Sequence, residues 1–293
     1  MKVVIKNSSL VFASEHIEVD ENIKTLLTNA YGTLSEAKMV SFQKFANSIG
    51  WGKENSIYSK LKVLIIPFLL NASKYSSLEN IFFNLKSGAY EQFGADGVQS
   101  KMKSSPSTYF DLSTKGLILK RTEPGEYSGF NKYKDSILVK NYRPFMIFDY
   151  INNPNNYDQI SSLGNLNTDG TGYGLRYSNE AGYDASISVC DGKNFKFDKD
   201  YQFILTKGIL VVGDNKAFGT ASEVTANVNN LDSVSYVKVP NFGGFNADGN
   251  SMSNTEKAYF KLFGFADGLS DAESTTLRDA LVKLKNELGM DEL

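Results

Sequence analysis

The amino-acid sequence predicts a mainly β protein, an antiparallel sandwich or jelly roll with a helical lead-in before it and one helix after it. Two observations support this fold class. Between residues 81 and 265, apolar and polar residues alternate in short segments separated by turn residues. The chain is also rich in residues that favour strands and turns, with 16 Tyr, 20 Phe and 24 Gly among 293 residues. The expected strands are 116–120, 136–140, 145–150, 173–177, 185–189, 201–205, 209–212, 234–238 and 259–265.

Two helices are expected near the N-terminus. Asp20 is a suitable N-cap for the first helix, which ends at Gly32. Thr33 and Glu36 form a T-x-x-E capping box for the second helix, which ends at Gly50. The apolar stripes, spaced three and four residues apart, are Ile23, Leu26, Leu27 and Ala30 in the first helix and Phe42, Phe45, Ala46 and Ile49 in the second. We therefore expect each helix to bury one face.

Two further elements complete the helical part of the prediction. Residues 57–70 are expected to begin as a helical turn and to continue as a buried strand that Pro67 interrupts. Near the C-terminus, Ser270 and Glu273 form a second capping box, and Gly289 ends the helix that follows. Its apolar stripe is Leu277, Ala280, Leu281, Leu284 and Leu288, so we expect it to pack on the outside of the sandwich.

Two residue pairs predict hairpin turns between strands. Asp191-Gly192 is the strongest such signal, because both residues readily adopt the left-handed backbone conformation of a tight turn. Lys207-Gly208 is a weaker signal of the same kind. No fixed-period repeat occurs, which argues against propellers and solenoids.

The composition excludes several kinds of chemistry. With one His and one Cys, the chain has no His/Cys zinc cluster and no disulfide within itself. A net charge of -2 argues against binding to nucleic acid through a basic surface. Residues 1–14 lack the continuous apolar segment of a signal peptide, so we expect synthesis and folding in the cytoplasm with Cys190 as a reduced thiol.

The C-terminal part of the sequence resembles a known fold family. The stretch from Tyr259 to Glu273 reads YFKLFGFADGLSDAE and runs into the helix that ends at Gly289. This stretch is similar to the closing segment of concanavalin-like (laminin-G-like) jelly-roll domains, where the last strand is followed by a Gly-Leu-Ser-Asp-Ala-Glu turn and a helix. The resemblance implies a concanavalin-like jelly-roll sandwich.

The N-terminal part resembles a narrower group, the jelly-roll proteins of tailed-phage virions, notably the crAss-like phages of gut bacteria. The similar residues are the helix 33–49, Ile57 to Lys62, Pro67 and Asn84 to Lys86. In that group a Trp-Ser-Lys-Met-Lys motif precedes a Pro and a Phe-Asn-Leu-Lys motif, and Tyr58 stands where the aromatic residue is often Trp. The resemblance implies a virion structural protein, a head- or tail-fibre or capsid decoration component with a lectin-like fold.

We expect two parts in the chain. Residues 1–80 form an N-terminal strand and helical lead-in for attachment and oligomerisation, packed on the sandwich, and residues 81–293 form the jelly roll with its C-terminal helix. The resemblance implies that other virion proteins are the partners and that the chain is a homo-oligomer, a homotrimer if it is a fibre. We expect neither nucleic-acid binding nor membrane insertion.

Signatures of hydrolases are missing from the sequence. No G-x-S-x-G motif occurs, and a His-based triad would have to use His16, which precedes the expected core. Glycoside hydrolases on concanavalin-like sandwiches carry an E-x-D-x-x-E array on one strand. Glu18 and Asp20 begin such an array, but Ile23 stands at its last position. We therefore expect no catalytic residue, although carboxylates from separate strands stay open as an alternative.

A calcium site is the metal site that the sequence suggests most closely. Residues 165–170 match the first half of an EF-hand loop, but its twelfth position is Arg176 instead of Glu. We interpret Asn167 and Asp169 as turn residues and expect no metal or cofactor, with a looser calcium site as the alternative.

Recognition of a glycan is the remaining hypothesis. Sugars bind to aromatic faces and to amide and carboxylate groups, which typically lie on loops of a rigid sandwich. Residues 150–158 and 169–173 have this chemistry, although exposed turns have the same composition. The candidate ligand-binding residues are Tyr150, Asn153, Tyr157, Asp158, Asn167, Asp169 and Tyr173.

Together these features favour a non-enzymatic virion protein that contacts a host-surface polysaccharide. An alternative is a carbohydrate-active enzyme, a glycan depolymerase on the same fold. A bacterial surface lectin is a third hypothesis, and the missing signal-peptide pattern counts against it.

Overall fold

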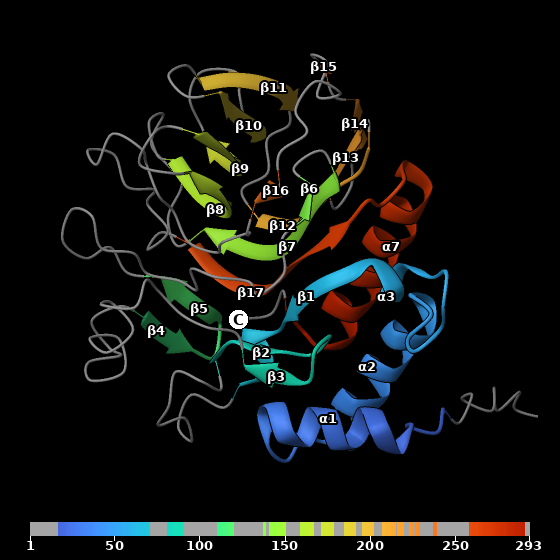
Figure 1. Ribbon diagram of the computed structural model, residues 1–293. Helices are drawn as coiled ribbons and strands as arrows, with labels where there is room; N and C mark the ends of the chain where they lie inside the picture. The colour runs from blue at the N-terminus through green and yellow to red at the C-terminus, as the bar shows by residue number, and fades with distance from the viewer. Residues whose placement is uncertain are drawn as a thin grey trace, which may run out of the picture.

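The computed structural model describes part of the chain: residues 17–70, 81–90, 110–119, 137–138, 141–150, 159–166, 171–178, 185–191, 195–201, 207–214, 216–219, 223–225, 227–228, 237–238 and 258–290. Figure 1 shows the described strands as stacked layers, with the helices gathered on one side of them. None of the described helices is long and apolar enough to cross a lipid bilayer.

The first helix, α1 (Glu21–Tyr31), begins and ends where the sequence predicts. The carboxylate of its N-cap Asp20 accepts hydrogen bonds from the backbone N–H groups of Asn22 and Ile23. Gly32 ends the helix with a φ of 72°, a conformation that favours glycine. The predicted helix is thus confirmed.

The second helix, α2 (Glu36–Ser48), begins at a different residue from the one predicted. Ser35 is its N-cap, and the Ser35 hydroxyl accepts a hydrogen bond from the backbone N–H of Lys38. The predicted capping box of Thr33 and Glu36 is therefore wrong, because Glu36 is the first helical residue instead of the third. The predicted apolar stripe is confirmed, since Phe42, Phe45, Ala46 and Ile49 are all buried.

The segment after α2 folds as predicted. A helical turn, α3 (Ile57–Lys60), leads into the buried strand β1 (Leu61–Ile65), and Pro67 begins a 3-10 turn, η1 (Pro67–Leu69). The Tyr31 hydroxyl accepts a hydrogen bond from the backbone N–H of Ile66, which fixes α1 on the end of β1.

Among the described residues, eight strands form the larger sheet, and every pair is antiparallel. The order is β14-β13-β12-β7-β17-β5-β4, and β1 also pairs with β17. The bounds of these strands, apart from β1, are β4 (Phe110–Ser113), β5 (Gly116–Leu119), β7 (Tyr142–Tyr150), β12 (Lys207–Val212), β13 (Lys216–Gly219), β14 (Glu223–Thr225) and β17 (Ala258–Asp267).

A five-stranded antiparallel sheet has the order β15-β11-β10-β9-β8. Its strands are β8 (Gln159–Leu166), β9 (Thr171–Ser178), β10 (Ala185–Asp191), β11 (Phe195–Tyr201) and β15 (Asn227–Val228). Two smaller sheets pair β2 (Phe83–Asn84) with β3 (Ala89–Tyr90), and β6 (Ile137–Leu138) with β16 (Val237–Lys238). Strand β8 has no counterpart among the expected strands.

The two predicted hairpins have different outcomes. The Asp191-Gly192 hairpin is confirmed, because β10 and β11 pair and place Cys190 opposite Phe195. The Lys207-Gly208 hairpin is wrong, because both residues lie inside β12 and pair with β7. Pairing with β7 keeps Gly208 within the strand, so the chain does not turn there.

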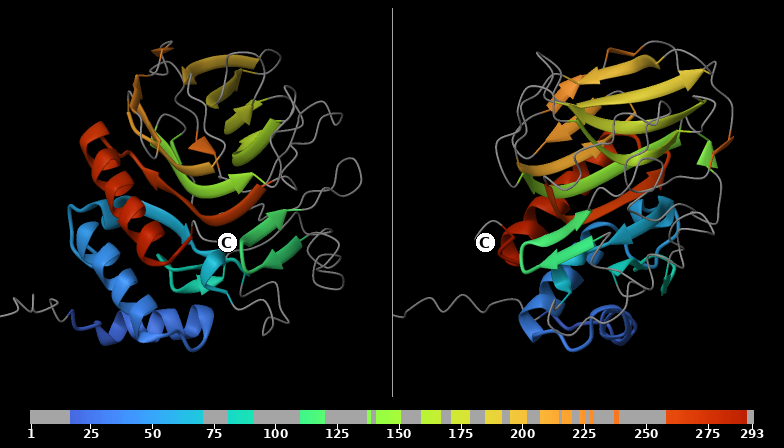
Figure 2. Two further views of the ribbon diagram at one scale, coloured as in Figure 1. Left: turned by 180° about the vertical axis from the view of Figure 1, so that it is seen from behind. Right: turned by 90° about the vertical axis from the view of Figure 1, so that its left-hand side faces the viewer.

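The central strands of the larger sheet are buried on both faces. Consecutive residues of a strand point to opposite faces, yet Phe145–Phe148, Ile209–Val212 and Phe260–Ala266 are buried without interruption. Figures 1 and 2 show α7 (Asp271–Glu287) and the five-stranded sheet on different sides of β7 and β12. One face of the larger sheet is therefore covered by helices, and the five-stranded sheet lies on the side of the other face (Figures 1 and 2).

Helix α7 confirms the predicted C-terminal helix. Both halves of the capping box between Ser270 and Glu273 are present, and Gly289 has a φ of 66°. The predicted stripe, Leu277, Ala280, Leu281, Leu284 and Leu288, is buried. The helix packs on β12, β13 and α2, as expected for a helix on the outside of the sheet.

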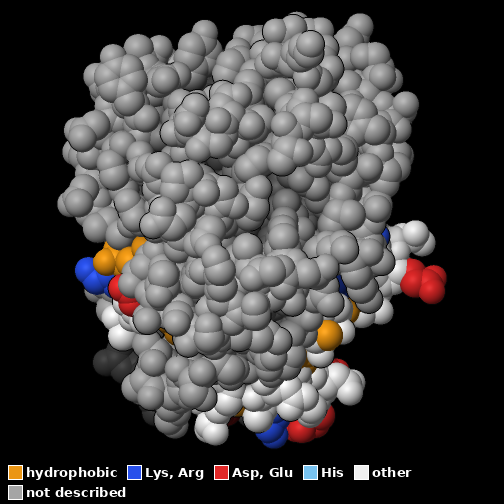
Figure 3. Space-filling view, turned by 60° about the vertical axis from the view of Figure 1, so that its left-hand side comes forward, with side chains coloured by type: hydrophobic (Ala, Val, Ile, Leu, Met, Phe, Trp, Pro, Cys, Tyr) orange, Lys and Arg blue, Asp and Glu red, His pale blue; other side chains and the backbone are white. Residues whose placement is uncertain are grey.

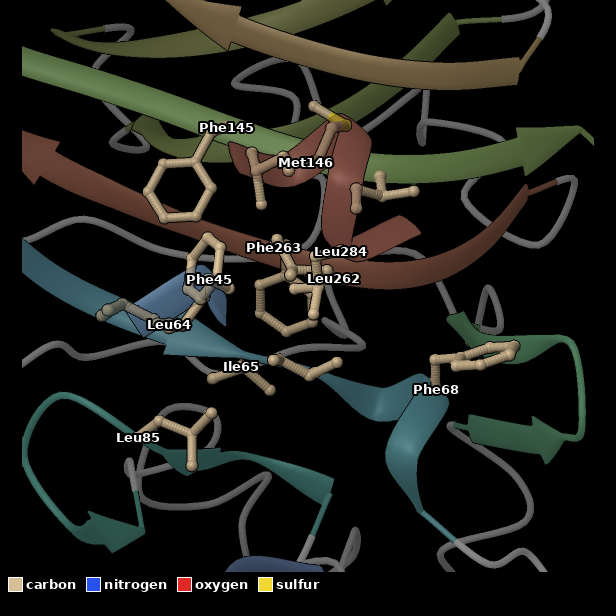
Figure 4. Close-up of a cluster of buried hydrophobic side chains, with 14 of the residues drawn as sticks. Phe45, Leu64, Ile65, Phe68, Leu85, Phe145, Met146, Leu262, Phe263 and Leu284 are labelled. Carbon is tan, nitrogen blue, oxygen red and sulfur yellow. The ribbon is translucent and has the colours of Figure 1, made fainter. Parts of the chain in front are cut away.

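The lead-in and the larger sheet share one hydrophobic core. Leu64 and Ile65 of β1 pack with Phe263 of β17, and Phe45 of α2 and Leu284 of α7 lie in the same cluster (Figure 4). Because β1 pairs with β17, part of the segment 1–80 belongs to the sheet of the segment 81–293. The described fold is mainly antiparallel β with helices packed on it, which confirms the predicted class at that level.

Candidate binding surface

Two of the predicted ligand-binding residues lie on described strands. Tyr150 ends β7 opposite Ala258, and Tyr173 lies in β9 between Asn165 and Val189. The two tyrosines thus belong to different sheets. The other predicted ligand residues, Asn153, Tyr157, Asp158, Asn167 and Asp169, lie outside the described residues, as does His16.

The described strands show where the two predicted loop regions are attached. The segment 151–158 joins the chain at the start of β8, and the segment 167–170 joins it at the end of β8. Eight residues of β strand extend over about 23 Å between their first and last Cα atoms. The two attachment points are therefore at opposite ends of one strand.

A buried ion pair lies beside Tyr150. The Lys261 ammonium is 2.5 Å from Oδ2 of Asp149, and the two side chains are 1% and 19% exposed. Lys261 lies at a bulge, where the register between β17 and β7 shifts between Phe260 and Leu262. Its ammonium also donates a hydrogen bond to the backbone carbonyl of Met290, after α7. The pair ties the C-terminal segment to the sheet.

A second group of polar and aromatic side chains lies where the lead-in meets the C-terminal helix. The ring centroids of Trp51 and Tyr58 are 4.4 Å apart, and the Lys86 ammonium lies 3.5 Å from the Tyr58 ring centroid. We call Trp51, Tyr58 and Lys86 the aromatic–lysine stack. Phe42 meets Trp51 edge to face at 5.4 Å, which joins the stack to the core.

The loop after α2 places Trp51 in this stack. Gly50 and Gly52 have φ values of 69° and 74°, which glycine adopts without a steric penalty. The Ser56 hydroxyl donates hydrogen bonds to the carbonyl oxygens of Gly50 and Lys53, and it caps α3. The loop is thus closed on itself, with Trp51 at its start and Tyr58 just after it.

Asn84 holds Lys86 against the same place. The Asn84 side-chain oxygen accepts hydrogen bonds from the backbone N–H groups of Leu64 and Lys86, and its amide donates to the carbonyl of Lys62. The side chain is fully buried, so these bonds fix the β2–β3 hairpin on β1. Lys86 in turn donates from its ammonium to the carbonyl oxygen of Tyr58, at 2.9 Å.

Two ion pairs join this region to the start of α7. Lys60 lies 2.7 Å from the Glu273 carboxylate and donates to the carbonyl of Gly268, and Lys62 lies 3.8 Å from Asp267. All four charged side chains are between 28% and 34% exposed. The residues that carry the two resemblances, Tyr58 to Lys62 and Asn84 to Lys86 on one side and Asp267 to Glu273 on the other, therefore meet in one junction.

Burial and neighbouring charges shift three pKa values in the junction. Burial, helped by repulsion from Lys62, lowers the pKa of the Lys86 ammonium below its usual value. Burial raises the pKa of the Tyr58 hydroxyl. Burial alone would raise the pKa of Glu273, but hydrogen bonds from Lys60 and Ser270 outweigh it, so that this pKa lies below its usual value. The junction thus stabilises a carboxylate at Glu273 and disfavours the positive charge on Lys86.

Sequence reasoning did not single out the stack as a site. Trp51 is the single Trp of the chain and lies between two glycines, which is the signal that was available. Its partners Tyr58 and Lys86 come from other segments, so their stacking depends on the fold. Among the described residues, no group of three or more His, Cys, Asp or Glu is arranged to hold a metal ion.

The surface in Figure 3 gives a view of a different side. Its described side chains are confined to the lower part of the molecule, where hydrophobic, basic and acidic side chains are mixed without a large patch of one kind.

Comparisons with known proteins identify no family. No protein family and no curated protein matches the sequence. A leech intramolecular trans-sialidase is similar over 55% of this chain and 27% of its own length, with a TM-score of 0.36 and 12% identity. The CBM40 of a Ruminococcus gnavus IT-sialidase, bound to α2,3-sialyllactose, is similar over 51% of this chain and 96% of its own length, with a TM-score of 0.35 and 12% identity. A Trypanosoma rangeli sialidase is similar over 86% of this chain and 39% of its own length, with a TM-score of 0.44 and 8% identity.

The chain thus spans about a quarter of the leech protein, and likenesses of this size assign it neither a family nor an activity. What the described residues establish is a class: a mainly antiparallel β protein whose helical lead-in and C-terminal helix are joined at an ion-paired, aromatic junction.

Proposed function

We propose that the chain is a non-enzymatic structural protein of a tailed-phage virion, a fibre or decoration component of the concanavalin-like jelly-roll group, which contacts glycan on the host surface. The observation that carries this proposal is the junction. The two stretches that resemble this group lie far apart in the sequence, yet Lys60 bonds to Glu273 and Gly268, and Lys62 lies beside Asp267.

The junction supports the proposal because it gives the two resemblances one physical cause. Lys60 and Lys62 belong to the motif of the lead-in, and Glu273 belongs to the turn before the C-terminal helix. If these motifs were chance matches, nothing would require their charged residues to pair. Their pairing favours a single structural unit, in which the lead-in closes on the last strand.

Contact with a glycan is supported by the chemistry of the same region. Trp51 on the hydrogen-bonded loop and Tyr58 just after it are partly exposed aromatic rings, and Lys86 is a fixed donor beside Tyr58. Aromatic rings bind the C–H faces of sugars, and ammonium groups bind hydroxyl and acidic oxygens. The shared core below the loop provides the rigid support that such a site needs.

Mass spectrometry of purified particles tests the virion role. Particles of a phage that encodes the chain, purified on a density gradient, should contain it at a fixed copy number relative to the capsid protein. Light scattering of the purified chain should give a homo-oligomer, a trimer if it is a fibre. Absence from the particles would overturn the proposal, whatever the chain binds.

A glycan depolymerase is the second candidate, and one observation favours testing it. Among the described residues, Oδ1 of Asp149 is buried and has no hydrogen-bond partner, which is unusual for a carboxylate oxygen outside functional sites. We expect no release of reducing ends from capsular polysaccharide. Release that Asp149→Asn abolishes, while the variant keeps its fold by circular dichroism, would favour the enzyme instead.

A further inference from the structure

We infer that the aromatic–lysine stack is a binding site for an acidic saccharide, with Lys86 and Lys62 binding the acidic group and the exposed parts of Trp51 and Tyr58 contacting the sugar. The inference rests on the proposed glycan contact and names the class of glycan. The chemistry shared by candidate ligands is an anionic group on a sugar ring, either a carboxylate or a sulfate.

The charges of the two lysines are not balanced by acidic groups. Among the described residues Lys86 has no carboxylate partner, and its ammonium contacts only the carbonyl oxygen and the ring of Tyr58. Lys62 has Asp267 at 3.8 Å, a long distance for an ion pair. Of the two ammonium groups, Lys62 alone has a carboxylate within 4 Å among the described residues, so an added anion would gain favourable interactions with both lysines.

The depressed pKa of Lys86 agrees with this imbalance. Burial is the main cause of the lowered pKa, and repulsion from Lys62 adds to it. A bound anion would reverse the shift, because it would stabilise the charged form of Lys86. The site is therefore expected to bind its ligand together with a proton when the pH approaches the pKa of Lys86.

The site is organised before any ligand binds. Asn84 fixes the backbone of Lys86, and the Tyr58 ring and carbonyl fix its ammonium. Trp51 is held by the closed loop and by its contact with Phe42. Because these groups are already ordered, binding costs less conformational entropy than it would at flexible lysines.

The geometry favours a saccharide over a bare anion. Tyr58 contacts both of the other groups, with its ring centroid 4.4 Å from that of Trp51 and 3.5 Å from the Lys86 ammonium. A single small anion can bind the lysines but offers no C–H surface to the indole. A ligand that carries both an acidic group and C–H surface, such as two linked sugar rings, has the length to contact both ends of the stack.

The single Trp of the chain makes the site directly measurable. Trp51 packs on Tyr58, and the Lys86 ammonium lies 3.5 Å from the centroid of the Tyr58 ring, so the fluorescence of Trp51 reports on this site alone. We would titrate the full chain with oligogalacturonate and, as the matched neutral ligand, with its methyl ester of the same length. Dextran sulfate and dextran form the second arm, which separates sulfate from carboxylate recognition, and inorganic phosphate is the control for a bare anion.

Three variants make the titration decisive. Lys86→Met and Lys62→Met keep most of the aliphatic stem and remove the charge, and each should weaken binding of the acidic ligand about tenfold or more. Lys283→Met removes a charge from the exposed face of α7 and should leave binding unchanged. A melting curve for each variant confirms that the fold is retained.

The inference would be overturned if Lys86→Met bound the acidic ligand as tightly as the unmodified chain, or if the methyl ester bound equally well. An equal response to inorganic phosphate would reduce the site to a general anion site and would also overturn it. If the saccharide titration fails, the virion role is still tested by mass spectrometry of the particles, which does not depend on Lys86. Conversely, a chain that binds oligogalacturonate through Lys86 but is absent from particles would keep the site and lose the virion role.

Discussion

The C-terminal segment is fastened to the rest of the molecule at two places that differ in burial. The first place is after the end of α7, where the backbone carbonyl of Met290 accepts a hydrogen bond from Lys261 of β17. Lys261 also pairs with Asp149, and its side chain is 1% exposed. At the start of α7, Lys60 bonds to Glu273, and both side chains are about one third exposed (34% and 28%). We call these the buried clamp and the junction clamp.

The difference between the clamps indicates which of them carries stability. A buried charge that loses its partner cannot be solvated, so removing one partner costs far more than the pair itself contributes. A partly exposed charge is solvated by water when its partner is removed, and its loss is small. We therefore expect the buried clamp to determine whether the fold forms and the junction clamp to tune it.

The largest effect is expected when the buried clamp is broken. Lys261→Ala leaves the Asp149 carboxylate without its partner and should lower the free energy of unfolding by about 3–5 kcal/mol. Urea denaturation of the variant and of the unmodified chain measures this. The double variant Lys261→Met with Asp149→Leu should recover much of the loss, because it leaves no unpaired charge. If the double variant is no more stable than the single one, the loss arises from packing and not from charge.

The contact between β1 and β17, which lies between the clamps, should have the next largest effect. A Cβ atom at Gly264 would collide with the carbonyl oxygen of Val63 and with the Phe145 ring. Gly264→Ala should therefore cost about 1–3 kcal/mol through overpacking. Gly268→Ala is the matched control, because a Cβ there would make only an ordinary contact, 3.9 Å from Cγ of Asn141, and the φ of 74° alone should cost about 1 kcal/mol. Equal losses at the two sites would contradict the close approach of β1.

The contribution of the junction clamp to the free energy of unfolding should depend on pH. The pKa of Glu273 is lowered in the folded chain, so its contribution to stability is present above the pKa of the unfolded state and is lost as the pH falls through the folded pKa. Glu273→Gln keeps a side chain that can cap the helix and removes only the charge. The stability difference between the two chains should shrink from about pH 7 to about pH 3. A difference that is independent of pH would exclude a role for the charge.

Local signals in the sequence were sufficient to place the starts of α1 and α7. Asp20 and the box of Ser270 and Glu273 mark helix starts correctly, because a cap depends on neighbours within four residues. Thr33 was the wrong choice for α2, since Ser35 offers a hydroxyl of the same kind two residues later. The apolar residues from Tyr259 to Phe265 predicted the strand β17 correctly, and the structure buries this strand on both faces.

Contacts between distant segments could not be derived in the same way. The pairing of Leu61 with Ala266 joins residues about 200 positions apart, and alternation specifies which residues form a strand but not which strand pairs with it. Strand β8 was not predicted, because its Ser, Asn and Gly residues are typical of a turn. Its Gly164 pairs with Gly174 of β9. The aromatic–lysine stack needs three segments at once, so neither Trp51 nor Lys86 revealed it alone.

The smallest effect is expected when the junction clamp loses its lysine. Lys60→Met keeps the aliphatic stem and should lower the free energy of unfolding by less than about 1 kcal/mol, because water solvates the exposed part of Glu273. Lys44→Met is the matched control, since Lys44 pairs with Glu287 at 2.9 Å between α2 and α7 at similar exposure. The two variants should be equally stable within error. A loss at Lys60 as large as that of Lys261→Ala would mean that the junction carries the fold, and the ranking of the two clamps would have to be reversed.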